Sequence, residues 1–259
     1  MDDCFSVGRV CGVGSKIVLG IDFEGSRRGA RLEDLAAEFH DETTLYRCHT
    51  IGYSGLRPRD ALAHATDCWL SGLGAGRSDV AVVVGFCSGG HIASYLANRL
   101  AADFGMDVPV VTFDTLPLDE KTIISEYNRY ISNLHEFLEP ADIAMAHRIP
   151  VGADLEPRSL ADSLVNGYAN LVERAADRAG IGGRVASQIV GSFAAYLEYL
   201  VLAICAEGGS HDVSDRIRIF SEEYNRFFGA EGITAKVGHD DLLLSDESRN
   251  TLRAVLMSD

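Results

Sequence analysis

The sequence predicts an α/β fold in which a mostly parallel central sheet is interrupted by a long helical insertion. Continuous apolar runs alternate with helical patterns through the first half of the chain, at Lys16–Asp22, Asp79–Gly85 and Val108–Phe113. Such runs are typical of parallel strands that are covered on both faces. Residues 118–207 then show helical periodicity with almost no strand signal, and strand-like segments return only afterwards. A sheet that stops and resumes in this way indicates an insertion into one domain.

The other elements follow in a regular order along the chain. Periodicity predicts helices near Ala30–Phe39 and at Arg57–Leu73, His91–Phe104 and Ser248–Met257, and strands at Thr43–Ile51, Arg216–Phe220 and Ile233–Val237. We therefore expect residues 1–117 and 208–259 to form the two parts of one core domain. Residues 118–207 would be a helical lid inserted between them.

The composition excludes some classes of partner. The chain has 259 residues, of which 47% are apolar and 24% charged, and these are ordinary values for a soluble globular protein. The formal net charge of −15 argues against nucleic acid or an anionic membrane as the main partner, because both carry the same sign. The most apolar stretch, Ile189–Ala206, contains Glu198, so we expect a buried helix there and no membrane span.

The cysteines point to a reducing compartment. Six of them are spread along the chain without a CxxC pair, so neither a disulfide framework nor a structural zinc site is expected. The first residues lack a basic segment followed by an apolar run, which a signal peptide would have. A cytoplasmic protein with reduced thiols is the resulting expectation.

The most informative segment is VVGFCSGGHI at residues 83–92, where a buried strand turns sharply into a helix. This is the strand–turn–helix context of a G-x-S-x-G nucleophile elbow, with Cys87 in the central place. The residues two before and two after the nucleophile are crowded, and Gly85 and Gly89 occupy those places. Centring the turn on Ser88 would instead crowd Phe86. Cys87 is therefore the predicted nucleophile, and the backbone N–H of Ser88 a predicted oxyanion donor.

A nucleophilic cysteine needs a base and a group that orients the base. His239 follows the predicted strand at 233–237, on the loop where this architecture places its base. The acid has two candidate positions. Asp114 ends the strand at 108–113, whereas Glu222 and Glu223 follow the strand at 216–220. Periodicity does not decide between them.

The GxCxGG elbow at Cys87, the V-x-F-D-T-x-P strand end at Asp114 and the late His239 together resemble the thioesterase domains of polyketide and nonribosomal peptide synthases, in a cysteine variant. The resemblance implies an α/β-hydrolase fold with a helical lid. In that family the acid follows the strand after the elbow. Asp114 lies 114 − 87 = 27 residues after Cys87, the family's usual spacing, so the resemblance favours Asp114 over the two glutamates.

The same resemblance implies the partner and the reaction. An acyl or peptidyl carrier protein would deliver the acyl chain on phosphopantetheine, and no metal or organic cofactor would be needed. The chain departs from the family in two respects: serine is the usual nucleophile, and editing thioesterases carry a Pro-x-x-Gly-Gly loop after the first strand. Here that loop begins Asp22-Phe23-Glu24, so the second oxyanion donor is expected to be the N–H of Phe23 or Glu24, and product release is favoured over editing.

Two alternatives stay open. Dienelactone hydrolases also have a G-x-C-x-G-G elbow, but their acid comes from a later strand and they lack a long helical lid. Some α/β-hydrolase folds serve as non-catalytic binding proteins, although all three triad positions here hold competent residues.

Overall fold

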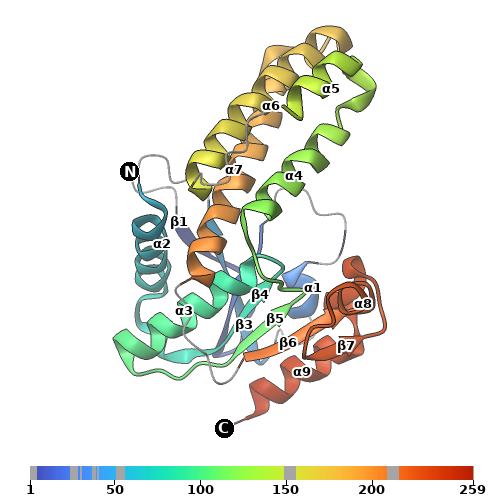
Figure 1. Cartoon of the computed structure of the whole chain (residues 1–259). Helices are drawn as coiled ribbons and strands as arrows, with labels where there is room; N and C mark the ends of the chain where they lie inside the picture. The colour runs from blue at the N-terminus through green and yellow to red at the C-terminus, as the bar shows by residue number, and fades with distance from the viewer. Residues whose placement is uncertain are drawn as a thin grey trace. The chain divides into compact units, whose positions relative to one another are not determined.

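A computed structural model describes residues 5–23, 29, 31–36, 39, 41–50, 56–148, 156–208 and 216–258. The chain forms two compact units (Figure 1). Met1–Pro117 and Cys205–Asp259 make up the core unit, and Leu118–Ile204 makes up the helical unit.

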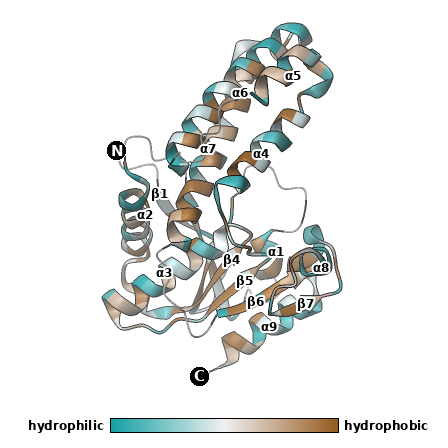
Figure 2. Ribbon diagram, in the orientation of Figure 1, coloured by the Kyte–Doolittle hydropathy of each residue, from teal (hydrophilic) through white to brown (hydrophobic). Residues whose placement is uncertain are grey.

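The core unit is built on a 7-stranded sheet with the order β1-β3-β2-β4-β5-β6-β7. Strand β1 runs antiparallel to β3, and every other neighbouring pair is parallel. The strands are β1 (Phe5–Gly12), β2 (Lys16–Ile21), β3 (Thr43–Thr50), β4 (Val80–Phe86), β5 (Val110–Phe113), β6 (Arg216–Ser221) and β7 (Ile233–Ala235). The predicted mostly parallel sheet is confirmed. Figure 2 shows β5 coloured mainly as hydrophobic, and all of its residues are buried, as expected of a strand covered on both faces.

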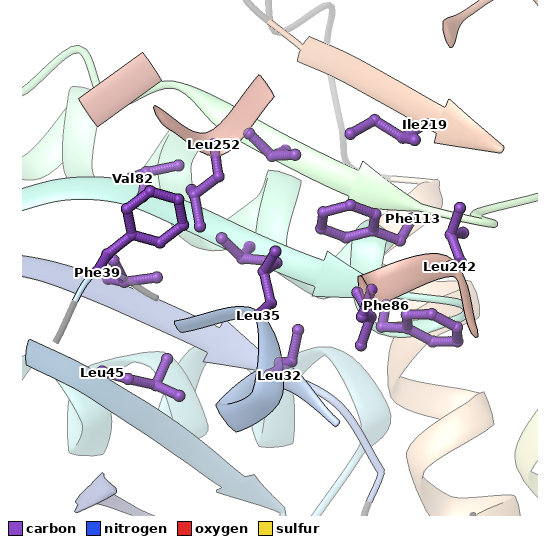
Figure 3. Close-up of a cluster of buried hydrophobic side chains, with 14 of the residues drawn as sticks. Leu32, Leu35, Phe39, Leu45, Val82, Phe86, Phe113, Ile219, Leu242 and Leu252 are labelled. Carbon is purple, nitrogen blue, oxygen red and sulfur yellow. The ribbon is translucent and has the colours of Figure 1, made fainter. Parts of the chain in front are cut away.

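Helices accompany this sheet throughout the core unit. They are α1 (Leu32–Ala36), α2 (Pro58–Leu73), α3 (Gly89–Phe104), α8 (Glu222–Phe228) and α9 (Asp246–Met257), with the 3₁₀ helices η2 (Gly74–Asp79) and η4 (His239–Leu244). One face of the sheet packs against α1, η4 and α9 through a buried cluster of leucine, valine and phenylalanine side chains (Figure 3). Phe86 and Phe113, the last residues of β4 and β5, belong to this cluster and are almost fully buried. Their burial fixes the ends of the two central strands, where the predicted site begins.

The helical unit consists of helices packed around aromatic rings. Its elements are α4 (Glu120–Ser132), η3 (His135–Phe137), α5 (Pro140–Ala146), α6 (Pro157–Ala179) and α7 (Gly183–Glu207), the last of which continues into the core unit. The rings of Tyr168 and Phe193 lie 4.4 Å apart, and that of Tyr130 lies 4.7 Å from Phe193. Asp142 of α5 is buried and binds Arg174 and Arg178 of α6. The aromatic rings thus join α4, α6 and α7, and the charged cluster joins α5 to α6.

Helix α7 is the one described helix that is long and apolar enough to cross a bilayer, judged by length and composition alone. Its most apolar window has a mean hydropathy of 1.9, and 44% of that window is buried within the protein. Glu198 in the middle of α7 lies 3.9 Å from a guanidinium nitrogen of Arg158 in α6. A charge that is paired inside the protein fits a packed helix better than a lipid-facing one.

The structure adds elements that the sequence pattern did not predict. Strand β1 and the short helices α8 and η4 were missed, and α1 is shorter than the helix expected near residues 30–39. Strand β1 escapes a search for apolar runs because glycine and arginine interrupt it. Its place at the edge of the sheet explains this composition, since an edge strand is not buried on both faces.

Candidate active site

The turn after β4 has the geometry of a nucleophile elbow. Cys87 follows the last residue of β4 and has a φ of 51°, and α3 begins two residues later at Gly89. A positive φ is costly for a residue with a Cβ and is typical of sites where the fold holds a side chain in a required place. The Cys87 N–H donates to the carbonyl oxygen of Phe113 at 2.7 Å, which ties the turn to the neighbouring strand.

Glycines allow the turn to pack this tightly. A Cβ on Gly85 would lie 2.5 Å from Gly90 Cα, and one on Gly90 would lie 2.7 Å from Thr115 Cγ2 and closer still to Thr115 Oγ1. The Thr115 hydroxyl donates to the carbonyl oxygen of Cys87 at 2.9 Å. The crowding predicted at Gly85 is therefore present. The need for Gly90 depends on Thr115, a contact between distant residues that spacing along the chain could not predict.

Asp114 follows β5, the strand next to the elbow strand. It is fully buried and has a φ of 46°. Its Oδ1 accepts the backbone N–H of Ser221 at 2.8 Å, and its Oδ2 lies 2.6 Å from His239 Nδ1. Because a carboxylate only accepts, Nδ1 carries the proton and Nε2 is the nitrogen left to accept one. Asp114 thus fixes the tautomer of His239 that a general base requires.

His239 begins η4, and its side chain is 27% exposed. Its ring lies 4.9 Å from the ring of Phe86, the residue that precedes Cys87. The ends of β4 and β5 therefore place Cys87 and Asp114 at the carboxyl edge of the sheet, where parallel α/β folds place their sites. His239 reaches the same edge through its contacts with Asp114 and Phe86.

The alternative acids lie elsewhere. Glu222 and Glu223 are exposed in the first turn of α8, and Glu222 forms an ion pair with Arg226. Among the acids that the sequence left open, the structure therefore pairs Asp114 with the imidazole.

The three predicted oxyanion donors have different positions. Ser88 directly follows Cys87 and precedes the first residue of α3, so its N–H lies at the positive end of that helix. The N–H of Phe23 donates to Asp22 Oδ1 at 2.8 Å, so in this structure it is already bonded to a carboxylate. Glu24 lies outside the described residues. A Cβ on Gly29 would lie 2.7 Å from Asp240 Cα, which shows how closely the chain after this loop approaches the histidine segment.

His91 is a second histidine near the elbow, but its surroundings differ. It is 5% exposed, and its Nε2–H donates to the carbonyl oxygen of Leu116 at 2.7 Å. Burial lowers the pKa of His91, so the ring stays neutral at physiological pH. Its hydrogen bond holds the segment after Asp114, and its other nitrogen, Nδ1, is buried, so the ring is poorly suited to act as a base.

Sequence reasoning missed two residues that contact the acid and the base. Ser221 holds Asp114 through its backbone, and the Tyr224 ring stacks on His239 at 5.0 Å and 13°. Ser221 ends β6 and Tyr224 lies in α8, on either side of Glu222 and Glu223, the acids that the sequence left open there. No three His, Cys, Asp or Glu side chains in the described part of the chain come together as metal ligands.

Comparison with known proteins gives the fold. No family model matches the sequence, and no curated protein matches it. The chain is similar to the solved structure of the Vlm2 thioesterase domain with genetically encoded 2,3-diaminopropionic acid, bound with a dodecadepsipeptide. That match has a TM-score of 0.51 and 18% identity, and it covers 96% of each chain.

An α/β hydrolase from Sphaerobacter thermophilus is similar to the same degree. Its TM-score is 0.51 at 15% identity, over 98% of this chain and 96% of that one. Together with the sheet order and the elbow, these likenesses establish that this chain has an α/β-hydrolase fold.

Proposed function

We propose that this protein is a thioesterase or acyltransferase that releases an acyl chain from a carrier-protein thioester through an acyl-enzyme on Cys87. The observation that carries the proposal is the hydrogen bond from His239 to the fully buried Asp114, beside a cysteine held at positive φ. A nucleophile, a base and a group that orients the base are the parts that acyl transfer requires. The fold shared with a thioesterase domain is consistent with this chemistry.

In the proposed acylation, His239 Nε2 takes the proton of the Cys87 thiol. The sulfur attacks the carbonyl carbon of the incoming thioester, and the Ser88 N–H faces the oxyanion that forms. As this intermediate collapses, the bond to the pantetheine sulfur breaks, and the imidazolium returns its proton to that sulfur. Asp114 stays ionised and stabilises the imidazolium throughout.

Release follows the same steps with a new nucleophile. Water, or a hydroxyl or amine of the acyl chain itself, gives its proton to His239 and attacks the Cys87 thioester. The Cys87 thiolate leaves and is then protonated by the imidazolium. Because the acyl-enzyme is itself a thioester, it is more reactive toward weak acceptors than a serine ester would be. Cyclisation and transfer are therefore as compatible with this site as hydrolysis.

The position of the acid favours this proposal over a dienelactone hydrolase. The group that orients His239 follows β5, immediately after the elbow strand, and a helical unit separates β5 from β6. Both features match the thioesterase pattern that the sequence resembles, whereas dienelactone hydrolases take their acid from a later strand. The proposal includes an acyl or peptidyl carrier protein as partner, in the cytoplasm, with no cofactor of its own.

The test is a panel of acyl-pantetheine thioesters followed by intact mass and peptide mapping. We expect an acyl adduct on Cys87 that is absent from Cys87→Ala, and a slower-turning ester on Cys87→Ser. Cys68→Ala is the matched control, because Cys68 is another partly exposed thiol of the core unit. Cleavage of small lactones or esters alone would favour the dienelactone hydrolase reading. No reaction with either substrate class would refute an acyl-transfer function.

A further inference from the structure

The imidazole of His239 lies against two aromatic rings. The Tyr224 ring is nearly parallel to it, with centroids 5.0 Å apart and an interplanar angle of 13°. The Phe86 ring lies 4.9 Å away at 60°. One ring comes from the strand that carries the nucleophile, and the other from the helix after β6.

Tyr224 is joined to the Asp114–His239 pair through its own segment. Ser221, the last residue of β6, donates its N–H to Asp114 Oδ1, and its hydroxyl accepts the N–H of Tyr224 at 3.4 Å. The Ser221 side chain thus caps α8 and sets where Tyr224 leaves the sheet edge. The segment Ser221–Tyr224 therefore holds Asp114 by a hydrogen bond at one end and contacts the His239 ring at the other.

We propose that Tyr224 is a positioning residue for His239, whose stacked ring keeps the imidazole directed at Cys87 while it accepts and returns a proton. This inference rests on the proposed function only in taking His239 as the base of Cys87.

The physical reason is that one hydrogen bond does not fix a ring. The Nδ1–H bond to Asp114 leaves the imidazole able to tilt about the line between the two residues, and Nε2 would move with it. The nearly parallel Tyr224 ring and the tilted Phe86 ring, both within about 5 Å of the imidazole, oppose that tilt. The tyrosine face also attracts the positive charge that the imidazole acquires when it takes the thiol proton. A misplacement of about 1 Å in a reacting group can reduce a rate on the order of a hundredfold.

Burial alone does not explain this placement of Tyr224. Of the α8 side chains that the structure describes, none is buried, and Tyr224 itself is only half-buried. The Tyr224 ring also lies near the ring of Phe228, which is 60% exposed. An aromatic residue that contributes little to the core has its ring on the imidazole, which favours a role at the site over a role in folding.

The experiment compares Tyr224→Leu, which removes the ring, with Tyr224→Phe, which keeps it. The control is Arg226→Ala, which breaks the exposed ion pair to Glu222 in the same helix without touching the imidazole. The rate of Cys87 alkylation by iodoacetamide at neutral pH reports activation of the thiol. The ring-proton resonances of His239, assigned with His239→Gln, report the stacking through ring-current shifts.

We expect Tyr224→Leu to slow alkylation about tenfold, as loss of a partly exposed stacked ring implies. The same variant should lose the ring-current shift. Tyr224→Phe and Arg226→Ala should stay within about twofold of the native rate, with the shift retained.

Unchanged alkylation in Tyr224→Leu would overturn the inference. An equal loss in Tyr224→Phe would do the same, because it would assign the effect to the hydroxyl and not to the ring. Neither readout uses a thioester. If the acyl-pantetheine panel fails while the Tyr224 contrast holds, the proposed function fails and the positioning role stands.

Discussion

Two buried aspartates, one in each unit, are stabilised in different ways. Asp114 of the core unit is fully buried, and its oxygens bind one backbone N–H and one imidazole. Asp142 of the helical unit is 4% exposed, and its oxygens bind Arg174 and Arg178 at 2.5 and 2.6 Å. Each oxygen of both carboxylates accepts at least one hydrogen bond, as burial of charge requires. They differ in whether the partner can give up its charge.

This difference separates a structural charge from one that can take part in chemistry. Arginine stays protonated at any physiological pH, so the Asp142 cluster has one charge state and can only hold helices together. An imidazole can take up a proton and release it again, so the Asp114–His239 pair can alternate between two charge states during a reaction. A buried carboxylate paired with histidine is therefore the stronger sign of a functional site.

Replacing Asp114 with asparagine should have the largest effect of these changes, and that effect should be on the reaction rate. The Asn side-chain oxygen can still accept the Ser221 N–H, but its NH₂ would face His239 Nδ1 and favour the tautomer with the proton on Nε2. That imidazole cannot take the thiol proton, so acyl-enzyme formation should slow about 10³- to 10⁴-fold. Quenched-flow mass spectrometry of the Cys87 adduct measures the rate. A loss below about tenfold would mean that Asp114 does not set the tautomer.

Replacing Asp142 with asparagine should leave the chemistry intact and weaken the helical unit. The Arg178 and Arg174 guanidinium groups hold the pKa of Asp142 at about 2, below its ordinary value. Its contribution to stability is therefore complete above about pH 4 and is lost as the pH falls toward 2. At pH 7, Asp142→Asn should unfold at a lower urea concentration than the native protein. The difference between the two urea midpoints should shrink as the pH falls toward 2.

Two signals separate the units in that measurement. The single tryptophan, Trp69, lies in α2 of the core unit, whereas the circular dichroism signal reports the α helices of both units, about half of whose described residues lie in the helical unit. The ellipticity midpoint should fall in Asp142→Asn while the Trp69 fluorescence midpoint and the Cys87 alkylation rate stay constant. If the Cys87 alkylation rate fell together with the ellipticity midpoint, Asp142 would also affect the active site, and the distinction between Asp142 and Asp114 would be wrong.

Much of the core unit could be predicted because its information is local. β2, β4 and β5 are buried on both faces, so their apolar runs are continuous, and the elbow is a short motif in one segment. The choice of Asp114 over Glu222 or Glu223 needed the family resemblance as well, because periodicity places all three at strand ends. The change from strand to helix pattern placed the insertion at residues 118–207, whereas the structure divides the chain after Pro117 and after Ile204, within α7.

The contacts that complete the site could not be predicted because they depend on register. Phe113 of β5 pairs with Ile219 of β6, and this pairing places the Ser221 N–H within hydrogen-bond distance of the Asp114 carboxylate. A shift of one residue would turn the side chains of β6 to the other face and remove Tyr224 from His239. Nothing in the sequence of either strand alone fixes that register.

Two glycines test the difference in packing between the units. Ala at Gly90 would overlap Thr115 in the core unit, so Gly90→Ala should lower the free energy of unfolding by about 1–3 kcal/mol and slow Cys87 alkylation. Gly191 is an exposed residue of α7, and no atom lies within 4 Å of a Cβ added there. Gly191→Ala should therefore raise the free energy of unfolding by about 0.5–1 kcal/mol. Urea unfolding measures both. If Thr115→Ala restored none of the Gly90→Ala loss, Thr115 would not be the source of the crowding.

The smallest expected effect concerns Asp22, the carboxylate that occupies the Phe23 N–H. If that N–H serves as the second oxyanion donor, a substrate must displace Asp22 Oδ1 before the oxyanion can bind. Removing this competitor in Asp22→Ala should speed acylation by thioesters about fivefold, the value of one net hydrogen bond. Alkylation of Cys87 by iodoacetamide should not change, because that displacement forms no oxyanion. Asp22→Asn keeps an acceptor and should behave like the native protein. If the rate of acylation by thioesters were unchanged in Asp22→Ala, the Phe23 N–H would not be an oxyanion donor. If both acylation and alkylation slowed, Asp22 would be a structural support of the loop.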